Sequence, residues 1–252
     1  MEKDQKKMFR FGLVGENISY SFSQQYFSEK FKSLKLENYE YQNFDIATID
    51  DFLATVSKIE GLKGMNVTIP YKEAILPYLD DIDKEAEKIG AVNTIKITNR
   101  FKLKGYNTDV YGFEESLLPF LEKRHKKALI LGTGGASKAV KYVFEKNDID
   151  VLFVSRSPKG EHEISYENLS KSILRAHTIL VNCTPLGTHP AIDKSPNIPY
   201  QYLTSNHLLY DLIYNPSRTI FLKNGQEKGT QITNGLKMLE LQAEKSWEIW
   251  NQ

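Results

Sequence analysis

Two titratable residues in the first half of the chain stand where they could transfer protons. Lys72 follows Pro70 in GMNVTIPYKEAILPYL, which indicates the first turn of a helix directly after a strand. Asp109 lies in GYNTDVYGFEESL, directly before a second helical stretch. A lone lysine most often faces solvent and a lone aspartate there is most often an N-cap, so each needs support from its surroundings. With that support, Lys72 would suit proton transfer, because the positive end of the helix dipole lowers the pKa of a lysine in a first helical turn.

Neutral hydrogen-bonding residues stand near the ends of other elements in this half. Each is ordinary alone, because serines commonly cap helices and polar residues commonly flank strands. In open α/β sheets, however, ligands bind at the carboxyl ends of strands. Such a set suits a small ligand with several hydroxyl groups. Its members are Ser21, Ser23, Asn66, Thr68 and Asn93.

A glycine-rich turn opens the second half of the chain. ALILGTGGASKA places Gly132, Gly134 and Gly135 directly after an apolar strand and directly before a helix. Residues without a Cβ allow a pyrophosphate to approach the N–H groups at the helix N-terminus. Ser137 replaces the third glycine of the usual pattern, so the packing of helix on strand should differ slightly. An ordinary glycine turn is the alternative, but this context favours dinucleotide binding.

The next strand ends in VLFVSRSPKG, which bears on the choice of dinucleotide. An NAD enzyme usually carries an acidic residue there for the ribose hydroxyls. This chain offers Ser155, Arg156, Ser157 and Lys159 instead. An arginine can pair with the 2′-phosphate of NADP, and no carboxylate opposes it. NADP is therefore favoured over NAD. Without the glycine turn upstream, the better interpretation of Arg156 and Lys159 would be that they are solvated loop charges.

The elements that position these residues indicate a two-domain α/β protein. Apolar strands and amphipathic helices alternate as βαβαβ from Phe9 to the helix after Pro70, which predicts a mainly parallel sheet. A hairpin is expected around Asn99-Arg100, and a helix from about Val110 to Leu121. A second alternation from Ala128 predicts a Rossmann-type domain. The last helix, about 236–250, has one apolar side.

Composition excludes several other classes of function. The 33 basic residues nearly balance the 32 acidic ones, which argues against a nucleic-acid or membrane partner. No stretch reaches the roughly 20 apolar residues of a bilayer span, and no signal peptide is evident. Cys183 is the single cysteine, and the five histidines share no helical metal-ligand spacing, so no metal site is expected. We expect a cytoplasmic protein with a small-molecule substrate, as a monomer or homodimer.

Seven sequence blocks together resemble the shikimate dehydrogenase family: NVTIPYK, GAVNT, GYNTD, GTGGAS, NCTPLG, YDLIYNPSRT and NGLKMLELQ, in this order. The resemblance runs from about Phe11 to the end of the last helix. It implies a substrate-binding domain (1–108), a Rossmann NADP domain (109–234) and a C-terminal helix (235–252) that returns to the first domain. The implied activity is the reversible NADPH-dependent reduction of 3-dehydroshikimate to shikimate, in aromatic amino acid biosynthesis.

By position, the resemblance makes Lys72 the main proton donor and acceptor, with Asp109 orienting it. The implied substrate-binding residues are Ser21, Ser23, Asn66, Thr68, Asn93, Tyr214 and Gln242. The implied cofactor-binding residues are Gly132, Gly134, Gly135, Ala136, Ser155, Arg156, Ser157, Lys159 and Thr184, with Ile213 and Gly235 near the nicotinamide. No metal is implied.

The chain departs from the family pattern at three places. Gln24 stands where proline usually follows the serines, so we expect a less rigid loop around Ser23. Val110 stands where glycine often follows the aspartate, and Ser155-Arg156-Ser157 replaces Asn-Arg-Thr. Two alternatives remain open: a quinate or quinate/shikimate dehydrogenase that uses NAD, and a non-catalytic NADP-binding module.

Overall fold

The computed structural model describes residues 7–18 and 21–252. Backbone contacts divide the chain into two compact units. Unit 1 comprises Met1–Thr108 together with Ala243–Gln252, and unit 2 comprises Asp109–Gln242. The last helix, α9 (Leu236–Asn251), therefore contributes residues to both units.

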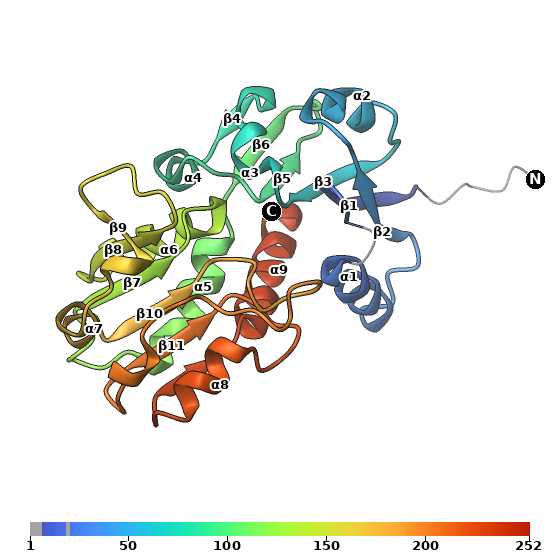
Figure 1. The fold of residues 1–252 in the computed structure, drawn as a ribbon. Helices are drawn as coiled ribbons and strands as arrows, with labels where there is room; N and C mark the ends of the chain where they lie inside the picture. Colours follow the sequence, from blue (N-terminus) through green and yellow to red (C-terminus); the bar gives the residue numbers. More distant parts are fainter. Residues whose placement is uncertain (1–6, 19–20) are drawn as a thin grey trace, which may run out of the picture. The chain divides into compact units, whose positions relative to one another are not determined.

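Unit 1 is built on a six-stranded sheet of order β2-β1-β3-β5-β6-β4 (Figure 1). β1 lies between β2 and β3 and is parallel to both, as the βαβαβ pattern predicts. β5 and β6 form the predicted antiparallel hairpin, and β4 pairs parallel to β6. The strands are β1 (Phe9–Gly15), β2 (Tyr39–Asp45), β3 (Leu62–Val67), β4 (Asp81–Ile82), β5 (Thr94–Ile97) and β6 (Leu103–Tyr106).

Short helices connect these strands. The helix expected after Pro70 forms only one α-turn, because Pro77 follows and a 3-10 turn takes over at Leu76–Tyr78. The peptide bond between Ile69 and Pro70 is cis. The helices are α1 (Phe22–Ser33), α2 (Phe52–Val56), α3 (Tyr71–Ala74) and α4 (Lys84–Ile89), with a further 3-10 turn at Ile49–Asp51.

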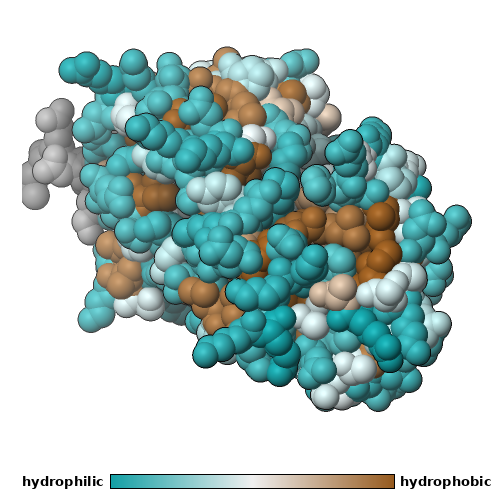
Figure 2. All heavy atoms as spheres, turned by 90° about the vertical axis from the view of Figure 1, so that its left-hand side faces the viewer, coloured by the Kyte–Doolittle hydropathy of each residue, from teal (hydrophilic) through white to brown (hydrophobic). Residues whose placement is uncertain are grey.

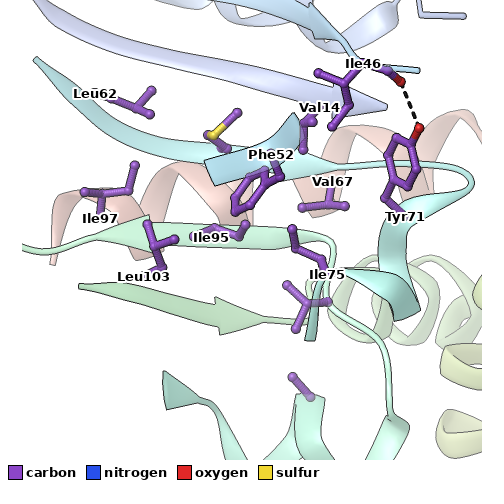
Figure 3. Close-up of a cluster of buried hydrophobic side chains, with 13 residues drawn as sticks. Val14, Ile46, Phe52, Leu62, Val67, Tyr71, Ile75, Ile95, Ile97 and Leu103 are labelled. Atoms are coloured by element: carbon purple, nitrogen blue, oxygen red, sulfur yellow. Dashed lines mark hydrogen bonds between the residues drawn. The ribbon is translucent and has the colours of Figure 1, made fainter. Parts of the chain in front are cut away.

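Each face of this sheet has its own apolar core. On one face, Phe52 and Ile95 are fully buried, and the hydroxyl of Tyr71 donates a 2.8 Å hydrogen bond to the carbonyl of Ile46 (Figure 3). The other core is aromatic. Its member Trp250, in the last turn of α9, lies 4.9 Å from Phe11 between ring centroids. The Trp250 indole N–H donates to the carbonyl of Ile95 at 3.0 Å.

Unit 2 contains a six-stranded, wholly parallel sheet of order β12-β11-β10-β7-β8-β9 (Figure 1). Numbered within the unit, this order is 6-5-4-1-2-3, which is the strand order of the Rossmann fold. The order reverses between β7 and β10, where dinucleotides bind in such sheets. The strands are β7 (Lys127–Leu131), β8 (Asp150–Ser155), β9 (Glu163–Ser165), β10 (Ile179–Asn182), β11 (Leu208–Asp211) and β12 (Gln231–Thr233).

The helices of unit 2 are α5 (Asp109–Leu117), α6 (Gly135–Lys146), α7 (Lys171–Ala176), α8 (Ile220–Gln226) and the first part of α9. The helix expected over 110–121 begins at Asp109 and ends at Leu117, since Pro119 lies in a 3-10 turn at Leu118–Phe120. Further 3-10 turns lie at Tyr166–Asn168 and Tyr200–Tyr202.

Hydrophilic side chains cover most of the face drawn in Figure 2, with apolar areas between them. Within the described ranges, no helix has both the length and the apolar character needed to cross a membrane.

The buried core of unit 2 is centred on aliphatic strand residues and on Phe221 of α8.

Candidate functional site

The predicted substrate-binding residues of unit 1 lie near the carboxyl ends of β1 and β3. The backbone N–H of Thr68 donates to the carbonyl of Val14 at 2.9 Å, which continues the strand pairing beyond β3. The strand order reverses here: α1 connects β1 to β2, which pairs with one edge of β1, whereas β3 pairs with its other edge. Open α/β sheets bind ligands at such points.

Asn66 on β3, itself half-buried, is the centre of a hydrogen-bond network whose other members include the buried Asn93, Thr94 and Ser246. Its Nδ2 donates to the carbonyl of Asn93 at 3.3 Å, to Thr94 Oγ1 at 3.1 Å and to Ser246 Oγ at 3.0 Å. Its Oδ1 accepts from the hydroxyl of Tyr41 at 2.8 Å. The Asn93 carbonyl can only accept a hydrogen bond and therefore faces Nδ2, whereas the Tyr41 hydroxyl donates to Oδ1. These two partners set the orientation of the Asn66 amide.

Asn93 orders the backbone that leads into α5. Its Oδ1 accepts from the backbone N–H of Thr108 at 2.7 Å and from Thr108 Oγ1 at 3.1 Å. Thr108 directly precedes Asp109, the first residue of α5. The Asp109 side chain is only 2 % exposed, and a carboxylate in a first helical turn is stabilised by the helix dipole.

Ser23 is connected to this network through Tyr41. Burial raises the pKa of the Tyr41 hydroxyl, and a hydrogen bond from Ser23 opposes that rise. Since Tyr41 gives its own proton to Asn66, its oxygen is the acceptor for Ser23. One chain of hydroxyl and amide groups therefore joins the start of α1 to β3.

Ser21 is held by a second polar group on β2. It is the N-cap of α1: its Oγ accepts from the backbone N–H of Gln24 at 3.2 Å and donates to Asn43 Oδ1 at 2.9 Å. Asn43 Nδ2 donates in turn to the carbonyl of Ile18 at 2.9 Å and to Gln24 Oε1 at 3.1 Å. Asn43 thus binds Ile18 on one side and, on the other, the start of α1, where Ser21 and Ser23 lie.

Lys72 lies in the single turn of α3, beside the segment before β5 that carries Asn93. Its backbone carbonyl accepts from the N–H of Val92 at 2.8 Å, and its side chain is half-buried. The preceding residue, Tyr71, is buried in the core, where its hydroxyl donates to the carbonyl of Ile46. Lys72 therefore sits on a short but firmly attached turn within the same unit as Asn66 and Asn93.

The glycine-rich turn of unit 2 joins β7 to α6 at the point where the strand order reverses. Gly132 has φ +102°, and a Cβ there would lie 3.0 Å from Thr184 Cγ2. A Cβ on Gly134, the N-cap of α6, would meet nothing within 4 Å, so the space above this helix end is open. Ser137 is 1 % exposed and its Oγ donates to the Gly134 carbonyl at 2.6 Å.

The segment after β8 carries the candidate 2′-phosphate residues. Arg156, Ser157 and Lys159 are exposed. The turn is closed by two hydrogen bonds, from the Ser157 N–H to Ser155 Oγ at 3.2 Å and from the Lys159 N–H to Glu163 Oε2 at 3.0 Å. The side chains of Ser155 and Glu163 thus order the backbone of this loop, while the side chains of Arg156 and Lys159 are exposed.

The remaining candidates of unit 2 lie after β11 and on α9. The Gly235 N–H donates to the Ile213 carbonyl at 3.1 Å, and a Cβ on Gly235 would approach the Leu212 carbonyl oxygen to 2.0 Å, so only glycine fits. Burial raises the pKa of Tyr214. On α9, Gln242 packs closely on α5, since a Cβ on Gly112 would lie 3.1 Å from its Cβ.

No group of three or more histidine, cysteine, aspartate or glutamate side chains that could hold a metal ion occurs in residues 7–18 and 21–252. The lone Cys183 follows β10, and burial raises the pKa of its thiol.

Comparison with known proteins decides the family. The profile of the "Shikimate dehydrogenase substrate binding domain" matches residues 13–95. A protein named "Shikimate dehydrogenase (NADP(+))" from Clostridium botulinum is 39 % identical over 252 residues, 96 % of each chain. The chain belongs to the shikimate dehydrogenase family.

Solved structures agree with this membership. Shikimate dehydrogenase 1 from Peptoclostridium difficile is 42 % identical, with a TM-score of 0.84 over 97 % of this chain and 92 % of that one. Shikimate 5-dehydrogenase from Thermus thermophilus, solved in complex with NADP(H) and shikimate, is 31 % identical, with a TM-score of 0.82 over 96 % and 93 % of the two chains. The predicted family, fold class and choice of NADP are confirmed.

The residues of unit 2 fit NADP. The left-handed Gly132, the open space beside Gly134 and the absence of an acidic residue in the first turn of α6 suit a pyrophosphate. Arg156 and Lys159 would hold the 2′-phosphate. These residue roles stay predictions.

The departures from the family pattern have local explanations. Gln24, expected to loosen the serine loop, contributes its N–H to Ser21 and its side-chain oxygen to Asn43, neither of which a proline could offer. Val110 is 2 % exposed within α5, so the helix accommodates it in the core.

The motifs alone did not identify several polar residues that hold the site together. Tyr41 and Asn43 lie in a strand read only for its apolar pattern, and Ser246 is fully buried on a helix read as amphipathic. The alternation of YEYQNFD places Tyr41 and Asn43 on one face, which was a usable signal. The contact of Ser246 with Asn66 spans 180 positions and had no local signal.

Proposed function

We propose that this chain catalyses the reversible reduction of 3-dehydroshikimate to shikimate with NADPH. One observation carries the proposal: the buried network of Asn66 and Asn93 and the turn with Lys72 lie in one unit of a shikimate dehydrogenase family member, at the strand ends where ligands bind. Relatives from several organisms are named "Shikimate dehydrogenase (NADP(+))".

In this proposal Lys72 handles the proton. Bound NADPH supplies the hydride that forms the new C–H bond at the ketone carbon. The carbonyl oxygen gains negative charge as its π bond breaks, and the Lys72 ammonium gives it a proton to form the hydroxyl. In the reverse direction the neutral amine takes that proton back. The Asp109 carboxylate would orient the reacting groups by accepting hydrogen bonds.

The substrate's carboxylate and hydroxyls would be held by neutral groups. Serine hydroxyls donate to a carboxylate, whereas amide groups can both donate to and accept from hydroxyls. Ser21, Ser23, Asn66, Thr68, Asn93, Tyr214 and Gln242 are the proposed set. We further propose a cytoplasmic location and no macromolecular partner beyond, at most, a second copy of the chain.

The direct test follows the atoms. Purified protein is incubated with 3-dehydroshikimate and NADPH whose transferable hydrogen is deuterium. The proposal expects shikimate as the product, one deuterium on the new carbinol carbon and one NADPH consumed for each shikimate formed. Oxidation of the cofactor without deuterated shikimate would contradict the proposal.

The hydrogen bonds around Asn43 lead to a prediction for substrate affinity. Asn43→Ala removes the partner of Ser21 and the ties to Ile18 and Gln24, so the serine loop should lose its fixed geometry. We expect the KM for shikimate to rise about fivefold, the equivalent of roughly one hydrogen bond, with kcat and the KM for NADP nearly unchanged. Steady-state kinetics with each substrate varied in turn measures this split.

Asn38→Ala is the matched control for this prediction. Asn38 is a half-buried asparagine directly before the same strand, and its Nδ2 donates to the carbonyl of Lys7 at 2.9 Å. Its loss should leave both KM values unchanged. If Asn43→Ala also left the KM for shikimate unchanged, the loop would not depend on Asn43.

A further inference from the structure

A buried carboxylate at the carboxyl end of β11 binds two neighbouring segments of unit 2 and the start of α8. Asp211 is fully buried. Its Oδ2 accepts from Thr219 Oγ1 at 2.5 Å, and its Oδ1 accepts from the backbone N–H of Ile213 at 3.1 Å and from Asn182 Nδ2 at 3.0 Å. Thr219 is itself the N-cap of α8. None of these contacts belongs to the proposed hydride or proton transfer.

Asn182 extends the network to the segment after β10. Its Oδ1 accepts from the backbone N–H of Thr184 at 3.0 Å and from Thr184 Oγ1 at 2.6 Å. Its Nδ2 also donates to the carbonyl of Leu186 at 3.2 Å. Because Leu186 and Asp211 offer only acceptors to Nδ2 and the Thr184 N–H needs an acceptor, the Asn182 amide has a single orientation, which the carboxylate helps to hold.

Ile213 is held from both sides. Asp211 binds its N–H, and its carbonyl accepts from Gly235 at 3.1 Å. The two segments also approach each other, since a Cβ on Gly187 would lie 3.4 Å from Ile213 Cδ1 and 3.2 Å from Thr219. One carboxylate therefore fixes Thr184 and Ile213 in relation to each other.

We propose that Asp211 is a positioning residue for the nicotinamide half of NADP(H): it holds Thr184, through Asn182, and Ile213 where they meet that half, without touching the cofactor. The proposal rests on the proposed NADP site. The adenosine half would be held by Gly132–Ala136 and Ser155–Lys159, none of which hydrogen-bonds to Asp211 in the contacts described above. Loss of the carboxylate should therefore weaken one half of the dinucleotide and spare the other.

The ionisation of Asp211 offers an independent readout. All three of its contacts are donors, which suits the ionised form. Burial raises the pKa of Asp211 to about 6, and the hydrogen bonds from Thr219, Ile213 and Asn182 oppose that rise. The titratable groups that face it are Cys183 and Tyr200, whose pKa values burial raises, so both stay neutral as Asp211 titrates. Protonation should loosen the network as the pH falls through about 6.

The test compares two ligands by isothermal titration calorimetry: NADP+, and 2′-phospho-ADP-ribose, which lacks the nicotinamide. For Asp211→Asn we expect the Kd of NADP+ to rise about tenfold, as for the loss of hydrogen bonds to a charged group, and that of 2′-phospho-ADP-ribose to stay within about twofold. Thr219→Val, which removes a single donor, should give a smaller rise for NADP+ alone. Asp150→Asn, which alters an exposed aspartate at the start of β8, should change neither.

The same titrations over about pH 5.5 to 8 use the ratio of the two Kd values, which cancels the titration of the 2′-phosphate that both ligands carry. The preference for NADP+ should decline below about pH 6 in the unaltered protein and be flat in Asp211→Asn. Equal weakening of both ligands, no weakening, or a pH-independent ratio in the unaltered protein would each overturn the inference. Binding needs no substrate, so absent turnover with intact binding would refute the proposed function and leave this inference standing.

Discussion

Lys72→Met should lower kcat by about a thousandfold, the loss expected when a positioned proton donor is removed. Methionine keeps the length and the apolar stem of lysine but has no ammonium group, so the developing alkoxide loses both its proton and its nearest proposed positive charge. The KM for shikimate should change far less, because the proposed binding groups, including Asn66 and Asn93, remain in place. Steady-state kinetics in both directions measures the two effects.

Lys72→Arg separates the two roles of the lysine. Arginine keeps the positive charge but does not release its proton at neutral pH. If proton transfer dominates, this variant should be nearly as slow as Lys72→Met, whereas charge stabilisation alone would leave it much faster. Lys88→Met, on the exposed side of α4, is the control and should keep full activity. Retention of kcat in Lys72→Met would remove this residue from the chemistry.

Arg156→Ala should raise the KM for NADP by about 10-fold to 100-fold, the range for losing charge-assisted hydrogen bonds to a phosphate. The loop backbone is closed by Ser155 and Glu163, so the change should remove the guanidinium without unfolding the turn. NAD has no 2′-phosphate, and its KM should stay the same. The ratio of kcat/KM for NADP to kcat/KM for NAD measures this change in preference, because any loss of activity common to both cofactors cancels.

Arg175→Ala removes the same charge near the end of α7 and should leave the cofactor preference unaltered. Arg156→Lys should recover part of the affinity for NADP, since a lysine keeps the charge but loses the planar two-point contact. An unchanged NADP preference in Arg156→Ala would show that another group, such as Lys159, binds the phosphate.

Features encoded by neighbouring residues could be predicted from the sequence. The glycine turn at Gly132, the hairpin at Asn99-Arg100 and the longer strands of both units depend on local sequence patterns, and the structure has them where expected, whereas the short strands β4, β9 and β12 were not predicted. Helix lengths were less accurate, because the 3-10 turns at Pro77 and Pro119 end α3 and α5 early. A periodic pattern alone does not show where a proline shortens a helix.

The long-range contacts of the supporting networks could not be predicted from the sequence. Asp211 ends the apolar run LLYD and pairs with Asn182, 29 positions earlier. Ser246 meets Asn66 across 180 positions. Such contacts depend on the order of strands in a sheet, which a motif does not encode. The resemblance supplied residues proposed to touch the ligands, whereas the structure supplied the residues that hold them in place.

The most direct measurement of the central claim is the rate of appearance of reduced nicotinamide in four parallel reactions: shikimate or quinate, each with NADP or NAD. The account predicts that shikimate with NADP has much the highest kcat/KM and that Lys72→Met lowers this rate by about a thousandfold. A higher kcat/KM with quinate or with NAD would contradict it, and so would the absence of turnover in all four reactions.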